Sequence, residues 1–113
     1  MSLARLTLVP GKPIIYIYDS QVDIVSRKIR QLGEWQHTEV KAVVWALNQT
    51  LPGGVVSPVL FVDIGANIGS LTLAVAAHGH TVVAFEGMPN NVLAMQASLC
   101  ANPTVMPRVH LVS

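Results

Sequence analysis

The spacing of apolar residues changes character at Gly54 and divides the chain into two parts. After that glycine, short runs rich in Val, Leu, Ile and Phe recur at residues 59–64, 81–85 and 108–112. Such runs are typical of parallel strands that are buried on both faces of a sheet. Between them lie two longer segments in which apolar residues have helical spacing. We therefore expect the order strand, helix, strand, helix, strand.

The two helices of this part have clear ends. The first is predicted to run from the glycine turn at Gly69 to about His78, where Gly79 closes it. The second is predicted over residues 89–101, with one apolar face made by Val92, Met95 and Leu99. This alternation predicts an α/β fold: the N-terminal βαβαβ half of a Rossmann-like, doubly wound parallel sheet.

The part before Gly54 has different patterns. Residues 14–18 are β-branched and aromatic, which predicts a short strand or an extended arm. Apolar residues then recur at helical spacing from Asp23 to a stop at Gly33. We interpret residues 1–54 as an N-terminal arm with a helical lead-in, and residues 55–113 as a partial ligand-binding domain.

A second lead-in helix is predicted to begin at Thr38, whose hydroxyl can cap it, and to end at the break formed by residues 51–54. Trp35 and Trp45 are expected to be core anchors of these helices, because large aromatic side chains usually pack inside.

Composition limits the classes of function. The chain has 113 residues, enough for one domain, and 51% are hydrophobic whereas only 12% are charged, against about 25% in an average domain. Such a chain resembles the interior of something larger. The net charge is +1 and the basic residues are scattered, so we do not expect a nucleic-acid partner.

Further expectations concern location and metals. The longest apolar stretch is interrupted by Asp63 and Asn67, so we expect no membrane span and a soluble, cytoplasmic protein. Cys100 is the only cysteine and is expected to be a small buried residue. His78 and His80 have no third ligand nearby in the sequence, and no metal site is predicted.

The segment from Phe61 to Gly69 carries the most chemical information, with the sequence FVDIGANIG. A glycine turn between a strand and a helix lets the backbone pass close to a ligand and points the free N–H groups of the helix at it. The dinucleotide fingerprint G-x-G-x-x-G fails here, because Asn67 and Ser70 stand where it has glycine. S-adenosylmethionine has no phosphate and tolerates a side chain at Asn67, and the carboxylate of Asp63 can help to hold its cationic amino-acid portion.

Glu86 is the second candidate. It ends the next strand, twenty-one positions after Gly65, close to the spacing of about 20 residues expected of an acid that binds ribose hydroxyls. Its carboxylate can accept hydrogen bonds from both hydroxyls of one ribose. The alternative is that Glu86 is simply the first solvated residue after a strand.

These segments together resemble a known family. FVDIGANIG, then Val83-Ala84-Phe85-Glu86, then Met88-Pro89-Asn90-Asn91 are similar to the FkbM family of S-adenosylmethionine-dependent methyltransferases, which show D-V/I-G-A-N-x-G and later A-F-E-P. Gly87 departs from the pattern, because the family usually has proline there.

The resemblance implies an enzyme that transfers a methyl group to a hydroxyl of a small molecule or sugar, with S-adenosyl-L-methionine as cofactor. By this resemblance the glycine turn with Ala66 binds the cofactor, Glu86 takes the ribose and Met88 lies against the adenine. The methionine and sulfonium side would be lined by Asp63, Gly65, Asn67 and Gly69. No catalytic residue and no acceptor is identified.

Two alternatives stay open. A full sheet of this kind has about seven strands and places the first one centrally, so the strand at 59–64 is expected to leave one apolar edge unpaired. The chain could thus be a non-catalytic module that self-associates or pairs with another chain through that edge. The other alternative is half of a nicotinamide-dependent oxidoreductase.

Overall fold

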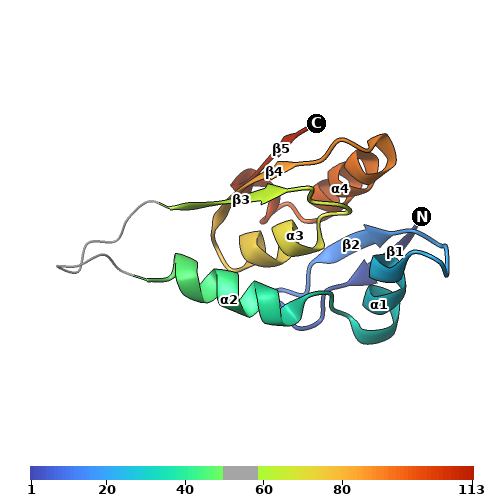
Figure 1. Ribbon diagram of the computed structural model, residues 1–113, viewed down its shortest axis with the longest axis horizontal. Coiled ribbons are helices and arrows are strands. Elements are labelled where there is room, and N and C mark those ends of the chain that lie inside the picture. Colours follow the sequence, from blue (N-terminus) through green and yellow to red (C-terminus); the bar gives the residue numbers. More distant parts are fainter. Residues whose placement is uncertain (50–58) are drawn as a thin grey trace.

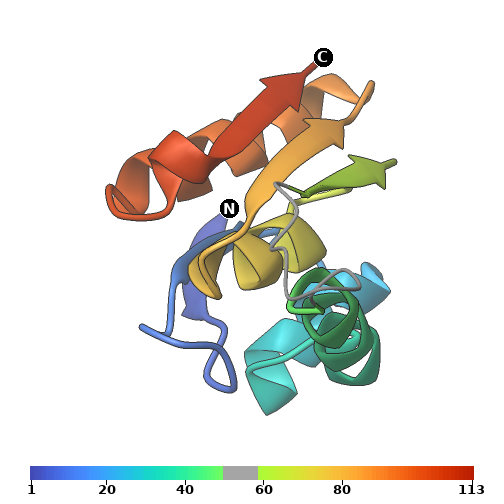
Figure 2. The same cartoon turned by 90° about the vertical axis from the view of Figure 1, so that its left-hand side faces the viewer.

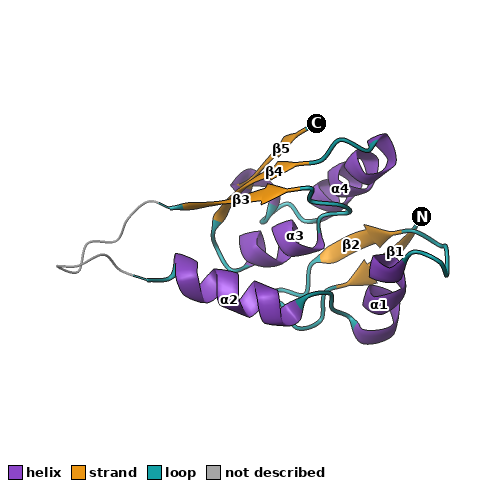
Figure 3. Ribbon diagram, viewed as in Figure 1, coloured by secondary structure: helices purple, strands orange, loops and turns teal. Residues whose placement is uncertain are grey.

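The computed structural model describes residues 1–49 and 59–113 and has a mixed α/β fold with two small sheets (Figure 1). Figure 3 shows the same elements by type. In chain order they are β1 (Ser2–Arg5), β2 (Ile14–Ile17), α1 (Ile24–Leu32), α2 (His37–Leu47), β3 (Leu60–Ile64), α3 (Ser70–Ala77), β4 (Thr81–Phe85), α4 (Pro89–Ala101), a 3-10 turn (Met106–Arg108) and β5 (Val109–Val112).

The second part of the chain forms the expected alternation. β3, β4 and β5 lie side by side in this order and are parallel (Figure 2). Asp63 lies opposite Ala84, and Ile64 lies opposite Phe85. The carboxyl ends of β3 and β4 therefore meet at one edge of the sheet. The helix predicted over residues 89–101 is confirmed as α4, with Val92, Met95 and Leu99 buried.

The prediction that β3 is buried on both faces is wrong. Its residues alternate between a covered face that includes Asp63 and an exposed face, on which the Ile64 side chain is 81% exposed. Among the described residues, β4 is the only strand that pairs with β3. The exposed face continues onto the other strands and is largely apolar, with Leu60, Val62, Ile64, Phe85 and Val112.

The N-terminal arm is a β-hairpin packed on α4. The strand predicted near residues 14–18 is β2, and it pairs antiparallel with β1, which the sequence analysis did not predict. Two buried side chains bind the backbone of β2, one from α4 and one from the residue that follows it: Ser98 Oγ accepts from Tyr16 N at 2.9 Å, and Asn102 contacts both polar backbone groups of Ile14. These bonds join segments more than 80 residues apart.

The two lead-in helices differ in how they begin. The Asp23 carboxylate accepts from Ser26 N at 2.8 Å, and Gly33 closes α1 with φ 70°, as predicted. Thr38 does not cap α2, which begins one residue earlier at His37. Instead, Glu34 Oε2 accepts a hydrogen bond from His37 N at 3.1 Å. The residue before the helix, Gln36, has a left-handed backbone conformation with φ 56° and makes no side-chain capping bond. The predicted break at 51–54 lies outside the described residues.

Two other burial predictions are wrong. Cys100 is exposed, because it follows Leu99 on α4 and the helical step of about 100° carries it off the buried face. Trp45 is 67% exposed, whereas Trp35 packs partly buried against the core.

One hydrophobic cluster includes side chains from both halves of the chain. Ile15 and Ile17 of the hairpin and Ile29 and Val40 of the lead-in helices belong to the same buried cluster as Leu73 of α3. The lead-in thus shares its core with the parallel-sheet part. No helix among the described residues is long and apolar enough to cross a membrane.

Replacing Asn102 by Ala should destabilise the protein. Its side chain accepts from Ile14 N at 2.9 Å and donates to Ile14 O and Ser98 O at 2.6 and 2.7 Å. Loss of these partly buried bonds should lower the free energy of unfolding by about 2–4 kcal/mol in urea denaturation. Asn90→Ala, at an exposed position of α4, is the matched control. Equal stability of the two variants would contradict a stabilising role of the Asn102 hydrogen bonds.

Candidate functional site

The site is built where β3 and β4 end. Gly65 N and Ala66 N both donate to the carbonyl oxygen of Phe85, at 2.9 and 3.0 Å. The turn after β3 is thereby fixed across the end of β4. Because Glu86 comes directly after Phe85, these two bonds bring the glycine turn and the carboxylate together.

Three residues of the turn have left-handed backbone conformations. Gly65, Asn67 and Gly69 have φ values of 76°, 58° and 91°. Asparagine tolerates this region better than most residues, and Asn67 Oδ1 accepts from Ile68 N at 2.8 Å. Gly69 also lies close to α4, since a Cβ there would be 3.0 Å from Met95 Cγ. Only glycine fits Gly69 without a shift of Met95.

Glu86 accepts a hydrogen bond at each carboxylate oxygen. Asn67 N donates to Oε2 at 2.7 Å, and Met88 N donates to Oε1 at 2.8 Å. Burial raises the pKa of Glu86, but these two N–H groups, the Asn91 side chain and Gly87 N outweigh it and hold the pKa below its ordinary value. Glu86 is therefore an ionised acceptor that is held by backbone donors at both carboxylate oxygens.

The N–H groups of the turn do not point into free space. Those of Gly65, Ala66 and Asn67 bond to Phe85 and Glu86, that of Ile68 to the Asn67 side chain, and that of Gly69 to Ala66 O at 3.0 Å. That the free N–H groups of the following helix face a ligand stays a prediction, because α3 begins only after this turn, at Ser70. Phosphate binding at such a turn depends on free N–H donors, and here a carboxylate takes one of them.

Asp63 lies beneath α3. Its side chain is buried, and Oδ2 accepts from the Thr72 hydroxyl at 2.6 Å. Burial raises the pKa of Asp63, the hydrogen bond from Thr72 opposes this, and the negative charge of Glu86 adds to the increase. In this position Asp63 joins β3 to α3.

An open groove of about 410 Å³ lies beside Glu86 at the ends of the three strands. Of the predicted residues, Gly65 and Glu86 line it, whereas Ala66 is buried in the turn. Met88 is 62% exposed just after Glu86. Ile64 and Phe85 also line the groove, with Gly87, Val112 and Ser113, and were not predicted as site residues. Their position at strand ends was the available signal.

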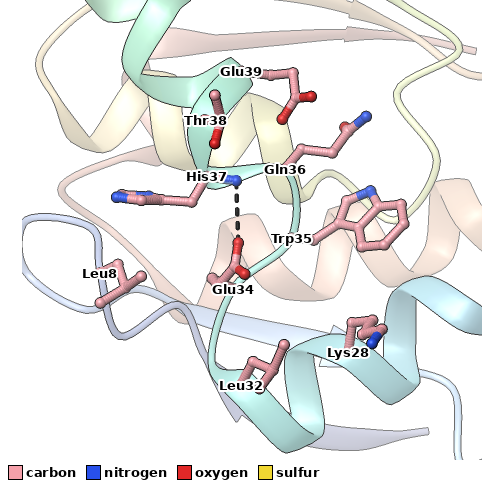
Figure 4. Close-up of a pocket in the computed structure, with 9 residues that line it drawn as sticks. All are labelled: Leu8, Lys28, Leu32, Glu34, Trp35, Gln36, His37, Thr38 and Glu39. Carbon is pink, nitrogen blue, oxygen red and sulfur yellow. Dashed lines mark hydrogen bonds between the residues drawn. The ribbon is translucent and has the colours of Figure 1, made fainter.

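A larger pocket of about 620 Å³ lies at the junction of α1 and α2 (Figure 4). Lys28 and Leu32 of α1, Trp35 of the connection and Glu39 of α2 are among its lining residues, and the Glu34–His37 hydrogen bond lies within it. It contains none of the predicted site residues. We favour the groove at the strand ends as the functional site, because ligands of open parallel sheets bind at the carboxyl ends of strands.

No family model matches the chain, and no curated protein and no solved structure was found to be similar to it. Within residues 1–49 and 59–113, no three His, Cys, Asp or Glu side chains gather in a way that could hold a metal ion.

Asp63→Asn should change the pH dependence of stability. A carboxyl group whose folded pKa is raised contributes most below its unfolded pKa, near 3.8, and this contribution is lost as the pH rises through the folded pKa. The free energy of unfolding of the variant minus that of the wild type should therefore increase between about pH 4 and about pH 7. Urea denaturation at several pH values measures it.

Asp19→Asn is the control of opposite sign. The N-terminal ammonium, 3.0 Å from Asp19 Oδ2, lowers the pKa of this exposed carboxyl group. Its contribution is present above the unfolded pKa and lost as the pH falls, so the same difference should decrease with rising pH. A flat or falling profile for Asp63→Asn would refute the assignment of a raised pKa.

Proposed function

We propose that the chain is the cofactor-binding portion of an S-adenosylmethionine-dependent methyltransferase, in which β3 to β5 are the first strands of a Rossmann-like sheet. The observation that carries this proposal is the ionised Glu86 carboxylate, bonded to Asn67 N of the glycine turn and lining the groove at the strand ends. The resemblance of the turn and of residues 83–91 to the FkbM family agrees with it.

The residues present fit the adenosine part of this cofactor. Asn67 N donates to one carboxylate oxygen of Glu86 and Met88 N to the other, and a ribose hydroxyl would bind to the same carboxylate. Gly65 and Gly87 leave open space around the groove, since a Cβ at either would meet nothing within 4 Å. The exposed Met88 side chain can cover the adenine. Direct contact of Asp63 with the amino-acid part of the cofactor stays a prediction. In the structure its side chain is buried under α3 and bonds to Thr72.

The cofactor would supply the reactive group, a methyl on a sulfonium, and the protein would bind and orient it. A hydroxyl of a small molecule or sugar is the acceptor we propose by resemblance, in a cytoplasmic enzyme. The catalytic residues stay unassigned.

The nicotinamide alternative is disfavoured by the hydrogen bonds of the turn. A pyrophosphate needs free N–H groups, but those of residues 65–69 are all satisfied within the protein.

Calorimetric titration with S-adenosylhomocysteine tests the proposal. The wild type should bind it, and Glu86→Ala should weaken binding at least about tenfold, because hydrogen bonds to a charged group contribute about 1.5–3 kcal/mol each. Glu39→Ala, at an exposed position on α2, is the control and should bind as the wild type does. Titration with NADH should give no heat of binding. A folded wild type that ignores S-adenosylhomocysteine would refute the function.

A second candidate function is favoured by the exposed face of β3 and by its second edge, at which no strand of the described residues pairs. Val62 and Ile64 are exposed there, and an apolar edge strand with free backbone groups is a template for pairing with another chain. A module that self-associates through this edge needs no cofactor.

Val62→Lys should separate the copies if β3 pairs with itself. A charge on this face opposes association, so light scattering should show an oligomer for the wild type and a monomer for the variant. Val22→Lys makes the same change on an exposed residue outside the sheet and should leave the mass unchanged. A monomeric wild type at all concentrations would exclude this candidate.

A further inference from the structure

The N-terminal arm contacts the first turn of α4 through Tyr18. This residue follows β2 and lies far from Glu86 in the sequence. Burial and the negative charges of Asp23 and Glu86 raise the pKa of its phenol. Its hydroxyl donates to Asn91 Oδ1 at 2.5 Å across 73 positions of the chain. A side chain of the lead-in is thus in direct contact with the first turn of α4, next to the candidate site.

Asn91 connects this contact to the site. It is buried, and its Nδ2 lies 3.7 Å from Met88 Sδ. Its side chain is also one of the groups that hold the pKa of Glu86 below its ordinary value. Because the oxygen of the amide is held by Tyr18, the NH₂ group must face the other way, toward Met88 and Glu86. The hydroxyl of Tyr18 therefore fixes which way the amide points.

Tyr18 is itself held firmly by α1. Tyr18 N donates to the buried Ser26 Oγ at 2.9 Å, and Arg30 Nη2 donates to Tyr18 O at 2.6 Å. Both polar groups of its backbone are therefore engaged by one helix. A phenol fixed in this way loses little further freedom when it bonds to Asn91.

We propose that Tyr18 is a positioning residue for the ribose-binding carboxylate: its hydroxyl orients Asn91, and Asn91 holds Glu86 and Met88 in place. This inference rests on the proposed function and extends it, since the cofactor site then includes the N-terminal arm. The contrasting view is that the Tyr18–Asn91 bond only attaches the arm to α4, as the Ser98 and Asn102 bonds do.

Tyr18→Phe removes the hydroxyl and leaves the ring. With Asn91 released, Glu86 should lose a donor and its pKa should rise, as followed by NMR titration of the labelled side-chain carboxyl in the full chain. Asp63 and Tyr18 are the other titratable groups that interact with Glu86. Affinity for S-adenosylhomocysteine should fall about three- to tenfold, as expected for one misplaced hydrogen-bonding group.

Tyr16→Phe is the matched control. Tyr16 lies on β2 two residues earlier, and its described hydrogen bonds to other elements involve only its backbone. This variant should leave both the pKa of Glu86 and the affinity unchanged. A Glu86 pKa that is the same in Tyr18→Phe and the wild type, or that shifts equally in Tyr16→Phe, would overturn the proposal.

A double-mutant cycle tests the route through Asn91. Asn91→Ala should raise the pKa of Glu86, and adding Tyr18→Phe should then change it no further. Equal and additive shifts would overturn the route. Because these pKa values are measured without ligand, failure of the wild type to bind S-adenosylhomocysteine would refute the proposed function and leave the test of Tyr18 intact.

Discussion

Three consecutive N–H groups of the turn after β3 donate hydrogen bonds to two consecutive residues at the end of β4. Gly65 and Ala66 donate to the Phe85 carbonyl, and Asn67 donates to the Glu86 carboxylate. The left-handed conformations at Gly65, Asn67 and Gly69 accompany this arrangement, and α3 starts directly after it. It places a negative charge where nucleotide-binding turns present free donors.

The pKa values of two carboxyl groups close to this turn are shifted in opposite directions. Glu86 has backbone donors on both oxygens and stays ionised, whereas burial favours the neutral form of Asp63 under α3. The negative charge of Glu86 adds to that preference. The site thus keeps one exposed negative charge beside the groove and one buried carboxyl group that bonds to Thr72.

The sequence predicts what depends on local pattern. The order of β3 to β5, the limits of α4 and the proximity of Glu86 to the glycine turn follow from apolar runs, breaks and a spacing of twenty-one residues. Contacts between distant segments were not predictable: β1 is too short to stand out, and nothing near Tyr18 points to Asn91. The prediction that β3 is buried on both faces was wrong, because an apolar run does not reveal whether both faces of a strand are covered.

The bonds from α4 to the hairpin also have a consequence for synthesis. Ile14 leaves the ribosome early, whereas its partner Asn102 follows 88 residues later. At about 5–20 residues per second, the hairpin waits about 4–18 s for the helix that satisfies its backbone. During that time its apolar side chains, Ile15 and Ile17, have no α4 to pack against. The nascent arm is therefore a segment that a ribosome-associated chaperone could bind, and its final folding must follow translation of Asn102.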